Sequence, residues 1–249
     1  MKKKIQNVLI TNDDGYQAIG LKILKDVAQQ LADNVFVICP KVNQSAKSKS
    51  ITIRKEINFE RISDFYWIID GTPTDCIIFA LNHLFKEKKP DLILSGINAG
   101  SNIGDEVSYS GTVAAAWEGA IRGINSIALS QYGGDSTLYS YEISKRYSYD
   151  TINFLINLDN NLPKFYNINF PNNYVQTENK KNFFFTNLAS QKMEDELTIN
   201  DEANSFIIGR MINRKVSSSN SDLEAIKKDK ISVTPLSLNL TNEEILKNI

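Results

Sequence analysis

The sequence has one histidine, two cysteines and a formal net charge of −1 among its 249 residues. A lone His83 excludes histidine-rich zinc chemistry and disfavours a Ser-His-Asp triad. Cys39 and Cys76 both lie in apolar segments, and without an export signal we expect free core thiols rather than a disulfide. Any chemistry must therefore use oxygen ligands, carboxylates and backbone amides.

Long apolar runs and charge of one sign are also missing. No stretch approaches the roughly 20 apolar residues that span a bilayer, and no apolar segment follows the basic start Lys2-Lys3-Lys4. With a net charge of −1, the sequence lacks the excess of basic residues that would attract a nucleic-acid polymer or an anionic membrane. We therefore expect a cytoplasmic protein whose partners are neither nucleic acid nor membrane.

Apolar strands alternate with helical patterns along the first two thirds of the chain. Leucines, Val27 and Ala28 recur at helical spacing over 19–32, and apolar runs at 35–39, 92–94, 127–129 and 166–170 are typical of buried strands. We also expect strands at 51–54 and 66–69, a helix capped by Thr72, a long loop from Ser95 to Ser110, and helices over 112–122 and 139–158. This alternation favours a doubly wound parallel sheet, an α/β fold.

The alternation of strand and helix patterns ends after Pro171. Two aromatic or β-branched runs, 182–188 and 204–210, predict a long hairpin, which we expect to pack on a partner subunit because an isolated hairpin is marginally stable. A strand at 231–234 and a helix over 241–249, capped by Thr241, follow. The predicted units are a catalytic core (1–175), an extended hairpin and oligomerisation segment (176–230), and a returning strand and helix (231–249).

Two adjacent carboxylates, Asp13 and Asp14, follow the apolar run Val8-Leu9-Ile10. Ligands of open α/β sheets bind beyond the carboxyl ends of the strands, and paired carboxylates repel unless a cation neutralises them. Hard ions such as Mg²⁺ or Mn²⁺ suit these oxygens. An Asx-type turn ending in Gly15 is the alternative interpretation.

The loop 95–105 follows another strand and is expected at the same sheet edge. Its glycines allow close approach to a ligand, and Asn98 and Asn102 offer neutral oxygens and amide donors, although a merely flexible connection has the same composition. It is neither a Walker A loop nor a GxGxxG fingerprint, which counts against an NTPase and a dinucleotide-dependent dehydrogenase.

Ser110-Gly111-Thr112 opens the next predicted helix. Its free amides and positive dipole end could hold an anion, although N-capping by Ser110 explains the same residues. A dicarboxylate for a cation and a helix N-terminus for an oxyanion, at one sheet edge, suit a metal-bound phosphate ester. Two further residues have structural interpretations. Ser45 lies in a loop after the second strand, where serine commonly serves a turn, and Asp75 lies in the first turn of a helix, where an acid stabilises the helix dipole.

Four motifs then carry a resemblance to a known family: the acidic stretch 8–15, Gly71-Thr72-Pro73-Thr74-Asp75-Cys76, the stretch 95–100, and Tyr109-Ser110-Gly111-Thr112-Val113. In this order they closely resemble the SurE survival-protein family of metal-dependent nucleotidases. The resemblance extends to Ile231-Ser232-Val233-Thr234-Pro235-Leu236 and so covers nearly the whole chain.

The resemblance implies a Rossmann-like three-layer α/β/α core with a mostly parallel sheet, plus a C-terminal extended β-hairpin exchanged between subunits of a homodimer or homotetramer. It also implies one divalent metal ion per subunit, held by Asp13, Asp14, Ser45 and Asn98, and a nucleotide substrate. This sequence departs from the family pattern at Ile19, Lys41 and Ala46, where the family usually has proline, an acidic residue and glycine.

The residues lead to a hypothesis of metal-assisted phosphomonoester hydrolysis, and the resemblance implies nucleoside 5′- and 3′-monophosphates as substrates, with short polyphosphate as a further one. Asp13 and Asp14 are the candidate catalytic residues, and Asn102, Ser110, Gly111 and Thr112 would bind the phosphoryl oxygens. Two alternatives stay open. One is a non-catalytic metal and nucleotide sensor; the other is a nucleotide-sugar or dinucleotide enzyme, which the missing GxGxxG disfavours.

Overall fold

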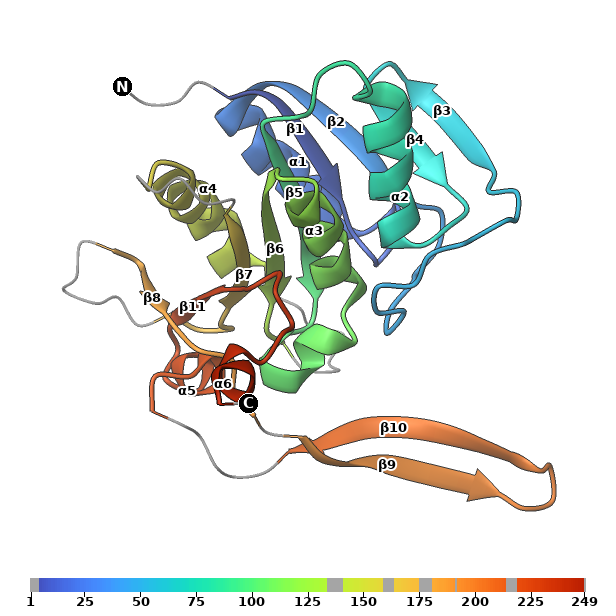
Figure 1. The fold of residues 1–249 in the computed structure, drawn as a ribbon, viewed down its shortest axis with the longest axis vertical. Helices are drawn as coiled ribbons and strands as arrows, with labels where there is room; N and C mark the ends of the chain where they lie inside the picture. Colours follow the sequence, from blue (N-terminus) through green and yellow to red (C-terminus); the bar gives the residue numbers. More distant parts are fainter. Residues whose placement is uncertain are drawn as a thin grey trace.

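A nine-stranded sheet runs through the computed structural model, which describes residues 5–133, 141–158, 164–174, 181–190, 192–213 and 219–248 (Figure 1). The strand order is β3-β4-β2-β1-β5-β6-β7-β11-β8, and a separate two-stranded ladder pairs β9 with β10. The strands are β1 Ile5–Thr11, β2 Ala32–Pro40, β3 Phe59–Ser63, β4 Tyr66–Ile69, β5 Leu92–Ala99, β6 Asn125–Gln131, β7 Phe165–Phe170, β8 Phe183–Phe185, β9 Lys192–Asn200, β10 Ser205–Asn213 and β11 Ile231–Pro235.

The middle of the sheet is parallel, from β4 through β2, β1, β5 and β6 to β7. After β1 the chain moves to β2 on one side, and β5 pairs with β1 on the other, so the topology switches at the carboxyl end of β1. Ligands of doubly wound sheets bind at such a switch point. The predicted α/β class with a mostly parallel sheet is confirmed.

Helices cover both faces of the sheet (Figure 1). Contacts join α1 to α4 on one face and α2 to α3 on the other. Because both faces are covered, β1 is a continuous apolar run, and Val8, Leu9 and Ile10 are fully buried. The helical segments are α1 Ile19–Leu31, α2 Pro73–Phe79, the π-helix Ala80–Leu84, the 3₁₀ helix Gly104–Ser108, α3 Gly111–Ile121, α4 Glu142–Ile156, α5 Asp222–Lys227 and α6 Glu243–Lys247.

The predicted pairing of the C-terminal hairpin is wrong. Residues 183–185 form β8, which joins the main sheet beside β11, whereas β10 pairs with β9. Figure 1 shows the β9–β10 ladder projecting away from the rest of the molecule. The hydrophobic run at 182–188 therefore contributes an edge strand of the main sheet, in which Phe183 is buried and Phe185 is exposed.

Three local predictions also fail. Residues 51–54 are not a strand in the structure, and the predicted loop 95–110 contains the end of β5 and a 3₁₀ helix. The last helix begins at Glu243, and its cap is Asn242 rather than Thr241, since the Asn242 side chain accepts from the Ile245 amide. β3, which lies within a stretch too mixed in pattern to assign, is an exposed edge strand.

The division into units of 1–175, 176–230 and 231–249 stays a prediction. Within the second unit, residues 176–180 and 214–218 lie outside the described part of the chain, as do residues 139 and 140 of the predicted helix over 139–158. β8 and α5 contact the main sheet, so the described residues that stand apart from it are those of β9, β10 and their connection. None of the helices that the structure describes is both long and apolar enough to cross a membrane.

Candidate active site

The acidic pair lies at the carboxyl end of β1, at the switch point of the sheet. Asp13 is 4% exposed and Asp14 is half-buried. The Asn12 side-chain amide donates to the Gly15 carbonyl oxygen at 2.8 Å, but its Oδ1 accepts no hydrogen bond, so the bond that defines the alternative Asx turn is missing. The bond to Gly15 supports a tight turn of another kind. It does not account for the two aspartates, because their side chains bond to other segments of the chain.

Asp13 is joined to the N-terminus of α3. The Thr112 hydroxyl donates to Oδ1 of Asp13 at 2.5 Å, across 99 positions of sequence. Gly111 permits this approach, since a Cβ at that position would lie 3.0 Å from the Cβ of Asp13. Ser110 is the N-cap of α3 and accepts from the Val113 amide at 3.1 Å, as its alternative interpretation expected.

Asp14 is joined to the end of β5. Its Oδ2 accepts a hydrogen bond from the Ala99 amide at 3.0 Å, which brings the adjacent Asn98 to the same edge of the sheet. The Asn98 side-chain amide donates to the Gly100 carbonyl at 2.9 Å. That bond uses the nitrogen of the Asn98 amide and leaves its oxygen as the atom suited to a cation.

The loop that carries Ser45 is tied to both sides of this edge. The Gln44 amide donates to the Asp13 carbonyl at 2.7 Å, so Ser45 follows a residue in direct contact with the acidic pair. Ser48 then donates from its hydroxyl to the Ser108 carbonyl at 2.7 Å and from its amide to the Tyr109 carbonyl at 2.9 Å. Ser45 itself is exposed, and its amide donates to Asn43. The role of Ser48 was not predicted, because a serine in a polar loop has no distinguishing pattern.

The electrostatics of the acidic pair are those of a cation site. Among the described residues, no lysine or arginine forms an ion pair with either carboxylate. Burial and, after it, repulsion by Asp14 raise the pKa of Asp13 to about 7, although hydrogen bonds from Thr112 oppose the rise. Burial also raises the pKa of Asp14. Two carboxylates with no cationic partner, beside hydroxyl and amide oxygens, fit a hard divalent ion.

The metal donors would have to include neutral oxygens. No group of three or more His, Cys, Asp or Glu side chains gathers within the described ranges. A hard ion bound by Asp13 and Asp14 would therefore need neutral oxygens and water to complete its coordination, and Ser45 and Asn98 remain the predicted donors.

Asn102 bonds to strands β6 and β7 rather than to the two aspartates. Its hydrogen-bond partners are Ser130 on β6 and Asn167 and Asn169 on β7, all fully buried. These partners were not predicted as functional. The available signal was the pair Asn167 and Asn169, since two asparagines two positions apart in a buried strand are unusual.

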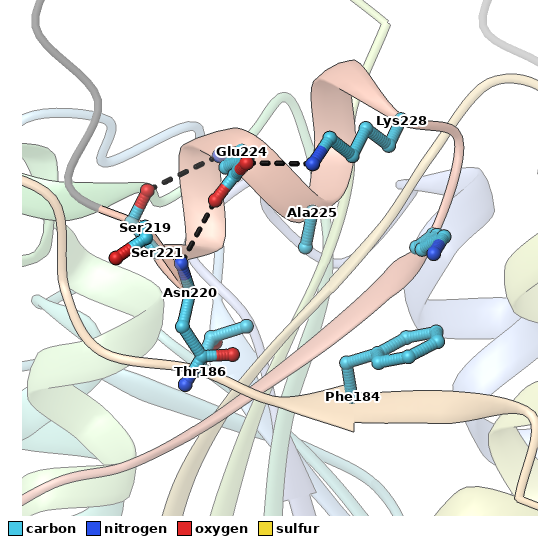
Figure 2. A pocket seen from close by; sticks show the side chains of 9 residues that line it. Phe184, Thr186, Ser219, Asn220, Ser221, Glu224, Ala225 and Lys228 are labelled. Atoms are coloured by element: carbon cyan, nitrogen blue, oxygen red, sulfur yellow. Dashed lines mark hydrogen bonds and ion pairs between the residues drawn. The ribbon is translucent and has the colours of Figure 1, made fainter.

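Asp75 has the structural role that the residues alone suggested. It completes a capping box with Thr72 and accepts two further hydrogen bonds from Thr52. Two of the larger cavities also lie away from the acidic pair. One of about 320 Å³ lies beside α5, where Phe184, Thr186, Glu224 and Lys228 line it (Figure 2), and one of about 410 Å³ lies between β3 and α2.

Comparisons with known proteins identify the family of the chain. The family model described as survival protein SurE matches residues 8–195. The chain is 37% identical over 243 residues to the 5′-nucleotidase SurE of Paramagnetospirillum magneticum, which covers 96% of this chain and 93% of that protein. It is 35% identical over 246 residues to the 5′-nucleotidase SurE of Methylobacterium nodulans, with 96% of each covered. The crystal structure of the SurE protein from Aquifex aeolicus superposes with a TM-score of 0.82, at 32% identity and 98% coverage of each chain.

Proposed function

The chain belongs to the SurE family, and we propose that it is a metal-dependent nucleotidase that releases phosphate from nucleoside 5′- and 3′-monophosphates. The observation that carries the proposal is the bond between Thr112 and Asp13. It joins an unpaired dicarboxylate, suited to a cation, to a helix N-terminus, suited to an oxyanion. A phosphate ester with its counter-ion needs both at one place.

Asp13, Asp14, Ser45 and Asn98 would hold one divalent ion per subunit, Mg²⁺ or Mn²⁺. When bound, such an ion neutralises charge on a phosphoryl oxygen and lowers the pKa of a water molecule that can attack phosphorus. The protein orients the donors beforehand, because Thr112 fixes the carboxylate of Asp13 and the Ala99 amide fixes that of Asp14.

The phosphoryl group is held by Ser110, Gly111 and Thr112, with Asn102. The first amides of α3 have no partners within the helix, and its dipole favours negative charge at this end. Gly111 keeps the surface beside Asp13 free of a side chain, so a phosphate can approach both. These donors stabilise charge that develops on the phosphoryl oxygens during attack.

The test is phosphate release from AMP, GMP and 3′-AMP by chelator-treated protein, with and without added Mg²⁺ or Mn²⁺. We expect release only with metal. Binding of metal and AMP without release, measured by calorimetry, would contradict hydrolysis and support the sensor. Release of phosphate from short polyphosphate is measured in the same assay.

The β9–β10 ladder supports a homo-oligomer formed by hairpin exchange. Two cross-strand pairs, Ile199 with Phe206 and Leu197 with Ile208, make one contiguous apolar face. These four side chains are 55%, 62%, 63% and 64% exposed for Leu197, Ile199, Phe206 and Ile208, respectively. A projecting ladder gains little stability within its own subunit, so burial of this face on a second copy explains it. A cytoplasmic location remains a prediction.

A further inference from the structure

The segment Asn102–Gly104 is held by residues that no motif of the sequence marks. The Asn102 amide donates to Oδ1 of Asn169 at 2.9 Å, and Nδ2 of Asn169 donates to the Asn102 carbonyl at 3.1 Å. Asn167 donates to the same carbonyl at 2.7 Å. Both main-chain polar groups of Asn102 are thus satisfied by side chains of β7.

The side chain of Asn102 is fixed from the neighbouring strand. Its Nδ2 donates to Oγ of Ser130 at 2.7 Å, and Ser130 is opposite Asn169 in the parallel pairing of β6 and β7. Ser130, Asn167 and Asn169 are all fully buried. Nδ2 carries two protons, so the bond to Ser130 fixes the plane of the Asn102 amide and leaves the second proton as the side-chain donor suited to a phosphoryl oxygen.

Gly104 is held from the C-terminal part of the chain. Oδ2 of Asp222 accepts from the Gly104 amide at 2.8 Å, while its Oδ1 accepts from the amides of Ala189 and Leu223 at 2.9 and 2.8 Å. Gly104 has φ +55°, and a Cβ there would lie 2.2 Å from the Ala189 carbonyl oxygen. The segment therefore has no room to shift toward residue 189.

Asp222 is itself kept in place at the start of α5. Ser221 caps this helix by accepting from the Glu224 amide, and the Asp222 amide donates to the Asn187 carbonyl at 2.9 Å. Figure 2 shows Asn220 and Ser221 at this end of α5, bonded to Glu224, which also pairs with Lys228. The start of α5 is thus stabilised by its own N-cap bond and by hydrogen bonds between Asp222 and the segment 187–189.

This arrangement is costly as a purely structural device. Asparagine is disfavoured in strand interiors, and Oδ1 of Asn167 is buried without a hydrogen-bond partner. Apolar residues at these two positions would remove the unsatisfied Oδ1 of Asn167 but would leave the buried main-chain amide and carbonyl of Asn102 without these partners. The Nδ2 atoms of Asn167 and Asn169 both donate to the Asn102 carbonyl. The two asparagine side chains therefore point toward the segment 102–104 and hold it.

We propose that Asn169 and Asp222 are positioning residues that hold Asn102–Gly104 in the geometry that binds phosphate, with Ser130 orienting the Asn102 amide. The inference rests on the proposed function, because it assumes that Asn102 contacts the phosphoryl group. Neither residue touches the carboxylates of Asp13 and Asp14, so their loss should weaken phosphate binding and spare metal binding.

The test compares Asn169→Ala with Ser232→Ala as a matched control. Ser232 is opposite Asn169 on β11, is fully buried, and has a hydroxyl without a partner. We measure the Kd of Mn²⁺, the Kd of inorganic phosphate in saturating Mn²⁺, and KM and kcat for AMP. In Asn169→Ala we expect the phosphate Kd and the KM to rise about tenfold, with the Mn²⁺ Kd changed less than about twofold. The control should match the wild type in all four quantities.

Asn169→Ala with unchanged phosphate Kd and KM would overturn the proposal, as would an equal loss of Mn²⁺ and phosphate affinity. If Asn169→Ala does not fold, Ser130→Ala and Asp222→Asn decide the question by the same readouts, with Glu224→Gln as the control for the second. Wild-type protein that neither binds phosphate nor releases it would instead refute the proposed function itself.

Discussion

Thr112 donates its hydroxyl proton to Asp13, and this bond joins two motifs that lie 99 residues apart. One end of the bond lies two residues after β1, and the other lies in the first turn of α3. The acidic pair and the helix N-terminus are therefore parts of one rigid site, and a change at either residue should alter both.

Asn at either position of the acidic pair should abolish turnover. Asp13→Asn and Asp14→Asn each remove one charge from the dicarboxylate but keep its shape. We expect kcat/KM for AMP to fall at least about 100-fold, more than the loss of a residue that only orients a ligand. Circular dichroism should be unchanged. Asp26→Asn, an exposed change in α1, is the control, and substantial residual activity in both site variants would contradict the assignment.

The Thr112 hydroxyl should matter more than the bulk of its side chain. Thr112→Val keeps the shape but removes the donor to Asp13, whereas Thr112→Ser keeps the donor. We expect about a 10- to 100-fold loss of kcat/KM in the valine variant and near wild-type activity in the serine variant. Equal activity of the two variants would show that the bond is dispensable.

Glu106 should make the protein less stable as the pH rises. Burial raises the pKa of this carboxyl, and the negative charge of Asp222 adds to the rise, although bonds from Ile103 and Ser101 oppose it. For an acid with a raised pKa, the stabilising contribution is complete below the unfolded-state pKa of about 4.3 and is lost as the pH rises through the folded-state value.

The measurement is urea unfolding of wild type and Glu106→Gln between pH 4.5 and 8. Glutamine mimics the protonated acid, so the variant should gain stability relative to the wild type as the pH rises. Glu202→Gln, in the exposed connection of β9 and β10, serves as the control. A wild-type-to-variant difference that stays constant over this pH range would refute the prediction.

Ala46 is strained in the loop that carries Ser45. Its φ is +57°, a left-handed conformation that glycine adopts more readily. Ala46→Gly should raise the free energy of unfolding by up to about 1 kcal/mol, because relief of strain outweighs the extra entropy of the unfolded chain. Lys47→Gly, at a neighbour whose φ is not positive, should lower it. Thermal unfolding of both variants decides the sign.

The apolar face of the hairpin should hold the oligomer together. A double substitution, Phe206→Asp with Ile208→Asp, puts two charges on that face, and we expect a smaller mass by light scattering at the same concentration. Thr198→Asp places a charge on the opposite face, beside Ile207, and should leave the mass unchanged. A monomeric wild type would contradict hairpin exchange.

The parallel core was predictable because its signals are local and strong. Val8-Leu9-Ile10 and Leu92-Ile93-Leu94 are buried on both faces, so each reads as a continuous apolar run whatever its neighbours. Pairing in the C-terminal part was not predictable, since β8 and the first half of β10 are both hydrophobic runs and only the tertiary structure decides which one joins β11. The hydrophobic periodicity of a strand does not indicate which other strand it pairs with.

The same distinction applies to the site. Asp13, Asp14 and the Ser110–Thr112 helix start were marked by type and by place at strand and helix ends. The contacts of Asn169, Asp222 and Ser48 were not, because each acts on a segment more than 50 residues away. Ser48 and Asp222 are of ordinary type for a loop and a helix start, and the one available signal was the presence of Asn167 and Asn169 in a buried strand.

The two bonds from Ser48 to residues 108 and 109 have a dynamic consequence. The loop that carries Ser45 is hydrogen-bonded to the residues just before Ser110, so it cannot move outward without breaking the bonds of Ser48 to residues 108 and 109. Under the proposed function, opening of this loop would expose the ion site and the phosphate site at the same time. Hydrogen exchange of the Gln44 and Ser48 amide protons would report how often this loop opens, since both amides are hydrogen-bonded only in the closed arrangement.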